Sequence, residues 1–183
     1  MEKQEHRTHL SAGEVVDKTN PRIEFRGRLD SLIADVVALQ VVAEREGLDS
    51  LVEELEETRE KLRDVLLCEV MDKPCDALSL WGLSSKEIRE QSHHPEKRFS
   101  LGHILPHHTM GLAAAGLNAL RTRAREAELS ACRAFGADPS RLDVIGVLNR
   151  LSSAFYILTY KYLPKNYDKT ITFSKIRERR ADA

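Results

Sequence analysis

Residues 121–135 place charged side chains on the side of a helix that should be buried. At 100° per residue, the apolar residues of this stretch and of the turn before it share one side: Leu117, Leu120, Ala124, Ala131 and Phe135. Glu128 falls inside that apolar stripe, and Arg121 and Arg125 lie along its edge. Because unpaired buried charge is expensive, these side chains require partners. The partners belong either to a salt-bridge network between helices or to an anion site closed by another segment.

Composition favours an all-α protein. At 183 residues the chain is long enough for one domain with a proper core. Charged residues make up 31% and aromatic residues only 5%, which together with leucine- and alanine-bearing periodic stretches is typical of helical proteins. A net charge of −1 gives no global electrostatic case for binding nucleic acid or a membrane surface.

The cellular compartment can be inferred from membrane-spanning, secretion and cysteine signals in the sequence. No segment is apolar and long enough to cross a bilayer, and the N-terminus has no signal-peptide core, so we expect no membrane partner. Three cysteines, Cys68, Cys75 and Cys132, are odd in number and lack zinc-site spacing. A reducing cytoplasm therefore fits best.

The chain divides into three parts. Residues 1–20 are polar and aperiodic and predict an irregular arm. Residues 21–163 predict a helical bundle. Residues 164–183 predict a basic, solvated tail, with contact to phosphate as the weaker alternative.

Apolar periodicity predicts four long helices, and a capping box at Ser84 to Glu87 adds a short one. The predicted ranges are 22–46, 49–71 (capped by Asp49 or Ser50), 84–91, 109–135 and 139–162. The last helix is apolar around most of its circumference, which suggests that it also packs against other subunits.

Two polar residues fall next to apolar stripes. Asp30 lies beside Ile33 and Val37, so we expect it to be half-buried and, on this pattern alone, a structural ion-pair partner. Asn149 lies between Leu142 and Ile145, so its amide requires a specific partner, either another side chain or a ligand.

Residues 92–108 hold five of the seven histidines but no convincing metal site. No histidine pair has i,i+4 spacing on a predicted helix, and no cysteine is close. The spacing of Glu90 and His93 matches a di-iron motif, but it occurs once and runs into Pro95. We therefore expect no bound metal. A long aperiodic stretch of this kind is commonly functional.

Three motifs together resemble the ATP:corrinoid adenosyltransferases of the propanediol-utilisation class. They are Pro-Arg-Ile-Glu-Phe-Arg-Gly-Arg-Leu-Asp (21–30), Arg-Thr-Arg-Ala-Arg-Glu-Ala-Glu (121–128) and Leu-Asn-Arg-Leu-Ser-Ser (148–153). The ethanolamine-utilisation branch is more similar still, through residues 8–12, 82–88, 92–93 and 103–106. The likeness covers about residues 8–163.

The resemblance implies a five-helix bundle that forms a homotrimer, with ATP and a corrinoid at each subunit interface. It implies transfer of the 5′-deoxyadenosyl group of ATP to the cobalt of cob(I)alamin, with Mg²⁺ accompanying ATP. The product, adenosylcobalamin, would serve ethanolamine catabolism. Implied partners are a flavoprotein cob(II)alamin reductase and an adenosylcobalamin-dependent lyase. The implied location is the cytoplasm, with association with a bacterial microcompartment left open.

The resemblance also implies roles for residues of this chain. Arg121 and Arg125 would meet ATP, and Asp30 would orient Arg121 across the subunit interface; these three form the expected catalytic set. Lys18, Glu128 and Asn149 complete the expected ATP site. The corrinoid would lie under the loop 92–108, against Phe99, His103, Ile104 and Leu105.

The chain departs from the wider class at three points. The class has an N-terminal Thr-Lys-Thr-Gly-Asp phosphate loop, where this chain has only Ser11-Ala12-Gly13, so the grip on the polyphosphate is open. His103 stands where the class has a phenylalanine. A Cys-rich segment found in some members of the ethanolamine branch is missing, so we expect no metal dependence of that kind. The alternatives are a non-catalytic corrinoid- or nucleotide-binding trimer and, more distantly, a ferritin-like metal protein.

Overall fold

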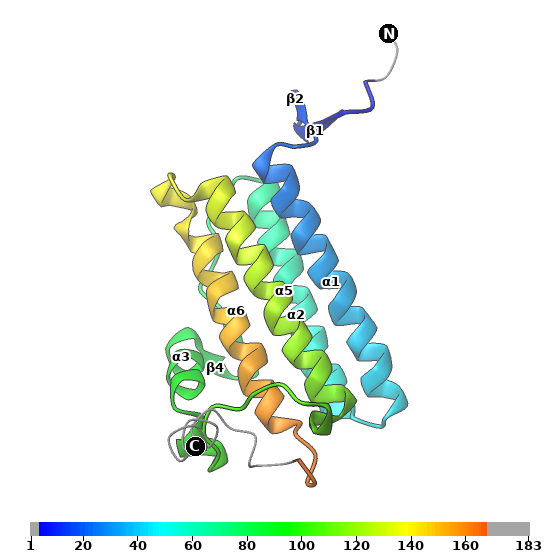
Figure 1. Cartoon of the computed structure of the whole chain (residues 1–183). Coiled ribbons are helices and arrows are strands. Elements are labelled where there is room, and N and C mark those ends of the chain that lie inside the picture. Colours follow the sequence, from blue (N-terminus) through cyan, green and yellow to red (C-terminus); the bar gives the residue numbers. More distant parts are fainter. Residues whose placement is uncertain (1–3, 168–183) are drawn as a thin grey trace, which may run out of the picture.

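Four long helices run side by side in the computed structural model, which describes residues 4–167 (Figure 1). They are α1 (Pro21–Arg45), α2 (Asp49–Val70), α5 (Gly111–Phe135) and α6 (Leu142–Lys161). Helix α1 packs against α2 and α5, and α5 packs against α6. The predicted helical bundle is confirmed, and the long helices begin and end close to the predicted residues.

Helix starts follow the local sequence in two cases and differ from the prediction in a third. The Asn20 side chain accepts from the Arg22 N–H at the start of α1. Ser84 and Glu87 form the predicted capping box of α3 (Ser85–His93). Helix α2 has Leu48 at its N-cap and no side-chain cap, so the predicted capping by Asp49 or Ser50 is wrong. The αL turn at Gly47 sets that boundary instead.

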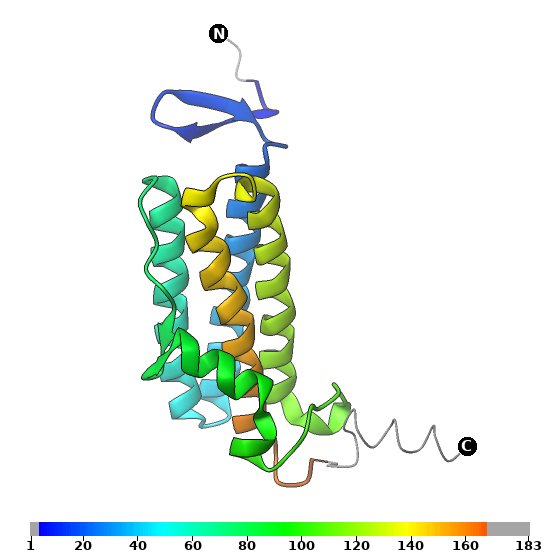
Figure 2. The ribbon, with the colours of Figure 1, turned by 90° about the vertical axis from the view of Figure 1, so that its left-hand side faces the viewer.

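Helix α3 covers the second apolar side of α6. It packs directly on α6, after a small hairpin of β3 (Ser79–Leu80) and β4 (Leu83–Ser84). Figure 2 shows this region crossing the outside of the bundle. The extra apolar surface of α6 is thus largely buried within the chain, and the predicted packing of α6 against other subunits stays a prediction. Leu142, at the start of α6, stays 52% exposed.

The segment after α3 is more ordered than the predicted loop. It contains α4 (Pro95–Phe99) and a 3₁₀ turn, η1 (His108–Met110), and a second 3₁₀ turn, η2 (Pro139–Arg141), precedes α6. Pro95 begins α4, and Ser100 ends it in the αL conformation. Helix α4 is thus a sixth helix, in addition to the five predicted.

Residues 7–17 form a β-hairpin, so the prediction of an irregular arm is wrong there. Strand β1 (Arg7–Ser11) pairs antiparallel with β2 (Glu14–Asp17), and Gly13 takes φ 112° in the turn. The strands are too short for a clear alternating pattern in the sequence. The hairpin lies beyond the end of the bundle at which α1 begins (Figure 1).

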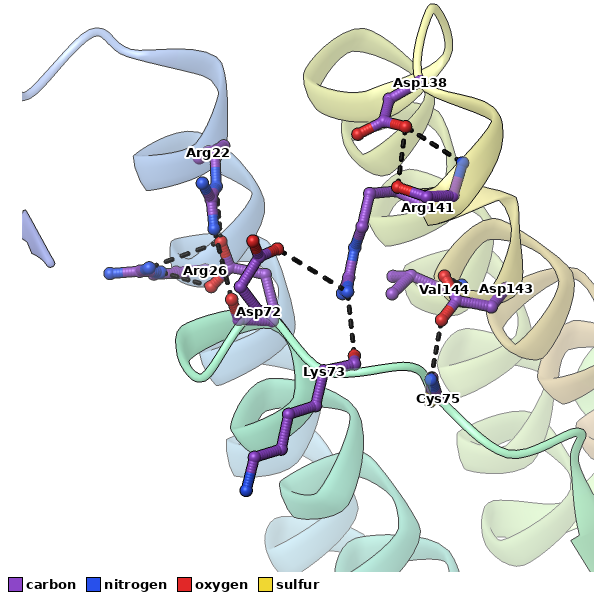
Figure 3. A network of polar contacts seen from close by, with 11 residues as sticks. Arg22, Arg26, Asp72, Lys73, Cys75, Asp138, Arg141, Asp143 and Val144 are labelled. Atoms are coloured by element: carbon purple, nitrogen blue, oxygen red, sulfur yellow. Dashed lines mark hydrogen bonds and ion pairs between the residues drawn. The ribbon is translucent and has the colours of Figure 1, made fainter.

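A buried carboxylate joins α1 to α2 near that end of the bundle (Figure 3). Glu69 is fully buried and accepts from Arg22 Nε at 2.7 Å and Arg26 Nε at 2.5 Å. Close by, the buried Arg141 donates to the Lys73 carbonyl at 2.8 Å. The two arginines neutralise the Glu69 carboxylate and so offset the cost of burying it.

By length and composition, residues 139–161, which comprise α6 and its preceding turn, could cross a membrane, so the prediction that no segment is long and apolar enough is wrong. More than half of its apolar window is buried inside the bundle, where Val147, Leu151 and Phe155 belong to the core. The apolar character of α6 is therefore that of a core helix. Most of the predicted basic tail, residues 168–183, lies outside the described residues.

Candidate functional site

Two arginines on α5 have no carboxylate partner within residues 4–167. Arg121 is half-buried; its Nε donates to Asn118 Oδ1 at 3.2 Å, and its guanidinium lies 5.7 Å from the centre of the Tyr156 ring. Arg125 is exposed and makes no polar contact with the described part of the chain. By contrast, Arg123 forms a surface ion pair with Asp35 at 3.0 Å. The chain therefore supplies no internal salt bridge for Arg121 or Arg125, and both remain available to an anion.

Glu128 and Asn149 meet between α5 and α6. Asn149 Nδ2 donates to Glu128 Oε1 at 2.8 Å, and Asn149 Oδ1 accepts from Arg150 Nη2 at 2.5 Å. The first contact supplies the partner that the position of Asn149 required. The two contacts also fix the orientation of the amide, because its nitrogen must face the carboxylate and its oxygen must face the guanidinium.

Arg150, which donates to Asn149, has a partly buried guanidinium group. Burial, and to a lesser extent the nearby charge of Arg89, lowers the pKa of Arg150, and its Nη1 is buried with no hydrogen-bond partner among the described residues. A pocket of about 330 Å³ lies on this side of α6, lined in part by Asp143, Asn149 and Arg150. Sequence analysis gave Arg150 no role.

Within the described part of one chain, Asp30 and Lys18 make no side-chain polar contact with the predicted ATP-site residues of α5 and α6. Asp30 is exposed on α1, so the predicted half-buried position is wrong, and it has no polar contact with the described residues. Lys18 follows the hairpin, and its backbone N–H donates to the His6 carbonyl at 2.8 Å; its side chain has no polar contact among residues 4–167. Ser11 ends β1, and Ala12 and Gly13 form the exposed turn of that hairpin.

The predicted corrinoid residues form a cluster around two tyrosines of α6. Phe99 stacks on Tyr160 with ring centroids 5.1 Å apart, and the buried Ile104 donates its N–H to Tyr160 Oη at 3.1 Å. His103 is exposed and stacks on Tyr156, with Nδ1 3.0 Å from Tyr156 Oη. Leu105 is half-buried beside them.

Sequence analysis missed Tyr156 and Tyr160. Their i,i+4 spacing on a predicted helix was the available signal, since it places both rings on one side. Burial raises the pKa of both phenols, so both remain protonated at neutral pH. Tyr156 contacts both Arg121 and His103 and therefore joins the arginine group to this cluster.

Metal-binding groups do not gather in the described part of the molecule. Among residues 4–167, no three His, Cys, Asp or Glu side chains are placed to hold a metal ion. The polar groups of the site are guanidinium, amide, carboxylate and phenol groups. Such groups can bind and orient a polyphosphate and an aromatic ligand, and they provide no obvious acid–base pair.

The fold and the site define a class of helical-bundle protein in which two arginines, without carboxylate partners among residues 4–167, lie on the same side of the bundle as an aromatic cluster. Within that class, the family model described as cobalamin adenosyltransferase matches residues 2–162. The chain belongs to the cobalamin adenosyltransferase family.

Relatives and solved structures agree with this assignment. The chain is 34% identical over 175 residues to the corrinoid adenosyltransferase EutT of Salmonella typhimurium and 33% identical to EutT of Escherichia coli K12. Each alignment covers 94% of this chain and 63% of the relative, so the chain spans less than two thirds of their length.

Two solved structures share the fold, and both are variants of the PduO-type ATP:corrinoid adenosyltransferase from Lactobacillus reuteri. The variant complexed with cobalamin and ATP has a TM-score of 0.69 at 21% identity and covers 92% of this chain and 95% of its own. The variant complexed with ATP has a TM-score of 0.64 at 22% identity, covering 85% and 88%.

Proposed function

We propose that this protein is an ATP:cob(I)alamin adenosyltransferase of the ethanolamine-utilisation type. The observation that carries the proposal is the side of the bundle formed by α5 and α6, where Arg121 and Arg125 have no carboxylate partner among residues 4–167 and Glu128 holds Asn149. This arrangement occurs in a chain that belongs to the cobalamin adenosyltransferase family. The names of the EutT relatives support the corrinoid substrate and the ethanolamine context.

The proposed reaction is a displacement at carbon. Cob(I)alamin donates an electron pair to C5′ of ATP, a cobalt–carbon bond forms, and the C5′–oxygen bond breaks with its electrons leaving on the polyphosphate. Cobalt is the nucleophile, so the protein needs to supply orientation and charge stabilisation rather than a catalytic base. Arg121 and Arg125 bind the polyphosphate, with Mg²⁺ neutralising further charge. Asn149 has a second N–H available for ATP.

A homotrimer would complete this site. Asp30 is exposed, and within the described part of its own chain neither Asp30 nor Arg121 has an ion-pair partner. Pairing Asp30 of one subunit with Arg121 of the next would satisfy both. Val37 and Val41 lie along the same side of α1 and are 42% and 43% exposed, which suits burial against a neighbouring subunit. Lys18 would reach ATP in the same interface.

The corrinoid would lie against Phe99, His103, Ile104 and Leu105, next to Arg121 through Tyr156. Because only cob(I)alamin is nucleophilic enough, an electron donor must precede this step, and a flavoprotein cob(II)alamin reductase is the proposed partner. The product would pass to an adenosylcobalamin-dependent lyase. The proposed setting is the bacterial cytoplasm, where a microcompartment could hold both.

A direct assay tests the proposal. The protein is incubated with ATP, Mg²⁺ and chemically reduced cob(I)alamin, and the absorption spectrum of adenosylcobalamin is followed. Catalytic growth of that spectrum is the expected result. Tight binding of ATP or corrinoid without turnover would refute the enzyme and favour a non-catalytic chaperone or sensor.

A further inference from the structure

The hydroxyl of Tyr160 is fully committed to three neighbours. It lies 3.0 Å from the Gly102 carbonyl oxygen, 3.1 Å from the Ile104 nitrogen and 2.8 Å from Tyr156 Oη. A carbonyl oxygen can only accept, so Tyr160 must donate its single proton to Gly102. The Ile104 N–H can only donate. Tyr160 therefore has one lone pair left, and the Tyr156 contact must use it.

This arrangement determines which way the Tyr156 proton points. Tyr160 has no second proton, so the 2.8 Å contact requires that Tyr156 donate to Tyr160. The oxygen of Tyr156 can then only accept from its other neighbour, His103 Nδ1, at 3.0 Å. His103 must donate from Nδ1.

A neutral imidazole carries one proton, so a protonated Nδ1 leaves Nε2 with a free lone pair. His103 is exposed, and its Nε2 contacts no polar group among residues 4–167. We propose that Tyr156 and Tyr160 are positioning residues that hold His103 in the Nδ1–H tautomer. They thereby present an unprotonated Nε2 at the surface of the cluster formed by the predicted corrinoid residues.

The ligand of Nε2 is an electron-pair acceptor, and identifying it as part of the corrinoid rests on the proposed function. Two groups of a corrinoid have this chemistry: the cobalt, and the N–H groups of the side-chain amides at the ring edge. The ring of His103 is held by stacking on Tyr156, with centroids 6.1 Å apart and an interplanar angle of 16°. Its lone pair therefore has a defined direction before any ligand binds, which reduces the ordering cost of binding.

The tautomer is tested without ligand. The protein is labelled with ¹⁵N-histidine, and the ring nitrogens are observed by NMR at alkaline pH, where the rings are neutral. The signals of His103 are assigned as those lost in His103→Phe. The expected result is an unprotonated Nε2 and a protonated Nδ1. A protonated Nε2 would overturn the proposal.

Two tyrosine variants test the cause. Tyr156→Phe removes the acceptor of His103 Nδ1–H and should release the ring into a mixture of tautomers. Tyr160→Phe lets Tyr156 turn its proton toward His103 and should favour the Nε2–H form. Tyr162→Phe is the matched control, because the Tyr162 hydroxyl donates to Glu54 at 2.7 Å, away from His103. An unchanged His103 tautomer in Tyr156→Phe would overturn the proposal.

The ligand is tested with bound cob(II)alamin. Electron paramagnetic resonance of cobalt(II) resolves splitting from an axial nitrogen, and this splitting changes with the isotope if that nitrogen belongs to the labelled histidine. A change that is lost in His103→Phe identifies cobalt as the ligand of Nε2. With no change, a corrinoid affinity about three- to tenfold weaker in His103→Phe identifies an amide N–H.

Unchanged splitting and unchanged affinity would overturn the corrinoid assignment of Nε2. The NMR result does not depend on the reaction. A protein with the expected tautomer but no adenosylation would therefore refute the proposed function and leave the roles of Tyr156 and Tyr160 intact.

Discussion

Asn149 on α6 donates a 2.8 Å hydrogen bond to the carboxylate of Glu128 on α5. The two residues lie 21 positions apart in the sequence, and the bond fixes an amide that also accepts from Arg150. Asn149 is thereby oriented in the free protein, with one N–H committed to Glu128 and one left for a ligand. Under the proposed function, Glu128 would act on ATP binding through Asn149.

The Glu128–Asn149 bond should appear as energetic coupling. We expect Asn149→Ala and Glu128→Ala each to raise the KM for ATP, because each removes or releases the oriented amide. The double variant should cost less than the sum of the two, by about 0.5–3 kcal/mol. Steady-state kinetics of the four proteins measures this. Cys132, exposed on α5, is the control: Cys132→Ala and Asn149→Ala should be additive.

Arg125→Ala should lower kcat/KM, because a cation for the leaving polyphosphate is lost. We expect the loss of transition-state stabilisation to be about 2–4 kcal/mol. Stability should change little, since Arg125 is exposed and makes no polar contact with the described residues. Arg123→Ala on the same helix removes only a surface ion pair and should keep activity. Equal activities of the two variants would refute the assignment of Arg125.

Asp30→Ala should weaken both the trimer and the activity, because Arg121 of the neighbouring subunit would lose its only carboxylate. Light scattering over a dilution series measures the oligomeric state. Asp35→Ala is the control, because Asp35 pairs with Arg123 within its own chain at 3.0 Å. A stable and fully active Asp30→Ala trimer would rule out the intersubunit pair.

Glu69→Ala should destabilise the fold by about 3–5 kcal/mol, because it leaves Arg22 and Arg26 without their buried carboxylate. Urea denaturation followed by circular dichroism measures the free energy of unfolding. Glu44→Ala, at an exposed position near the end of α1, should change it by less than about 0.5 kcal/mol. Similar losses in the two variants would show that the Glu69 network does not stabilise the bundle.

Cys75 should resist alkylation. Burial, and to a lesser extent the adjacent Cys68, raises the pKa of the Cys75 thiol to about 12, so little thiolate exists at pH 8. Cys132 is exposed and should react first, and labelling of Cys75 should accelerate as the pH rises toward 12. Mass spectrometry of peptides after timed iodoacetamide treatment measures both. Equal labelling of Cys75 and Cys132 at pH 8 would contradict the buried position of Cys75.

Residues whose environment depends on local periodicity were predicted well. The stripe of Leu117, Leu120 and Ala124 is buried, and Arg121 and Arg125 lie at its edge as predicted. The capping box at Ser84 is present, because it requires only residues within one turn. Glu128 and Asn149 were each recognised as needing a partner. The predicted half-buried position of Asp30 was wrong, because apolar neighbours on a helix do not determine how far other elements cover the edge of that helix.

The sequence by itself determined the four long helices, the capping box of α3 and the charged edge of α5. Each follows from residues three or four positions apart, whose geometry a helix sets without reference to the rest of the chain. Tertiary structure alone decided that Arg22 pairs with the buried Glu69 and that Tyr156 contacts His103. Those contacts join residues 47 and 53 positions apart, and no local period encodes a distance that arises only when helices pack.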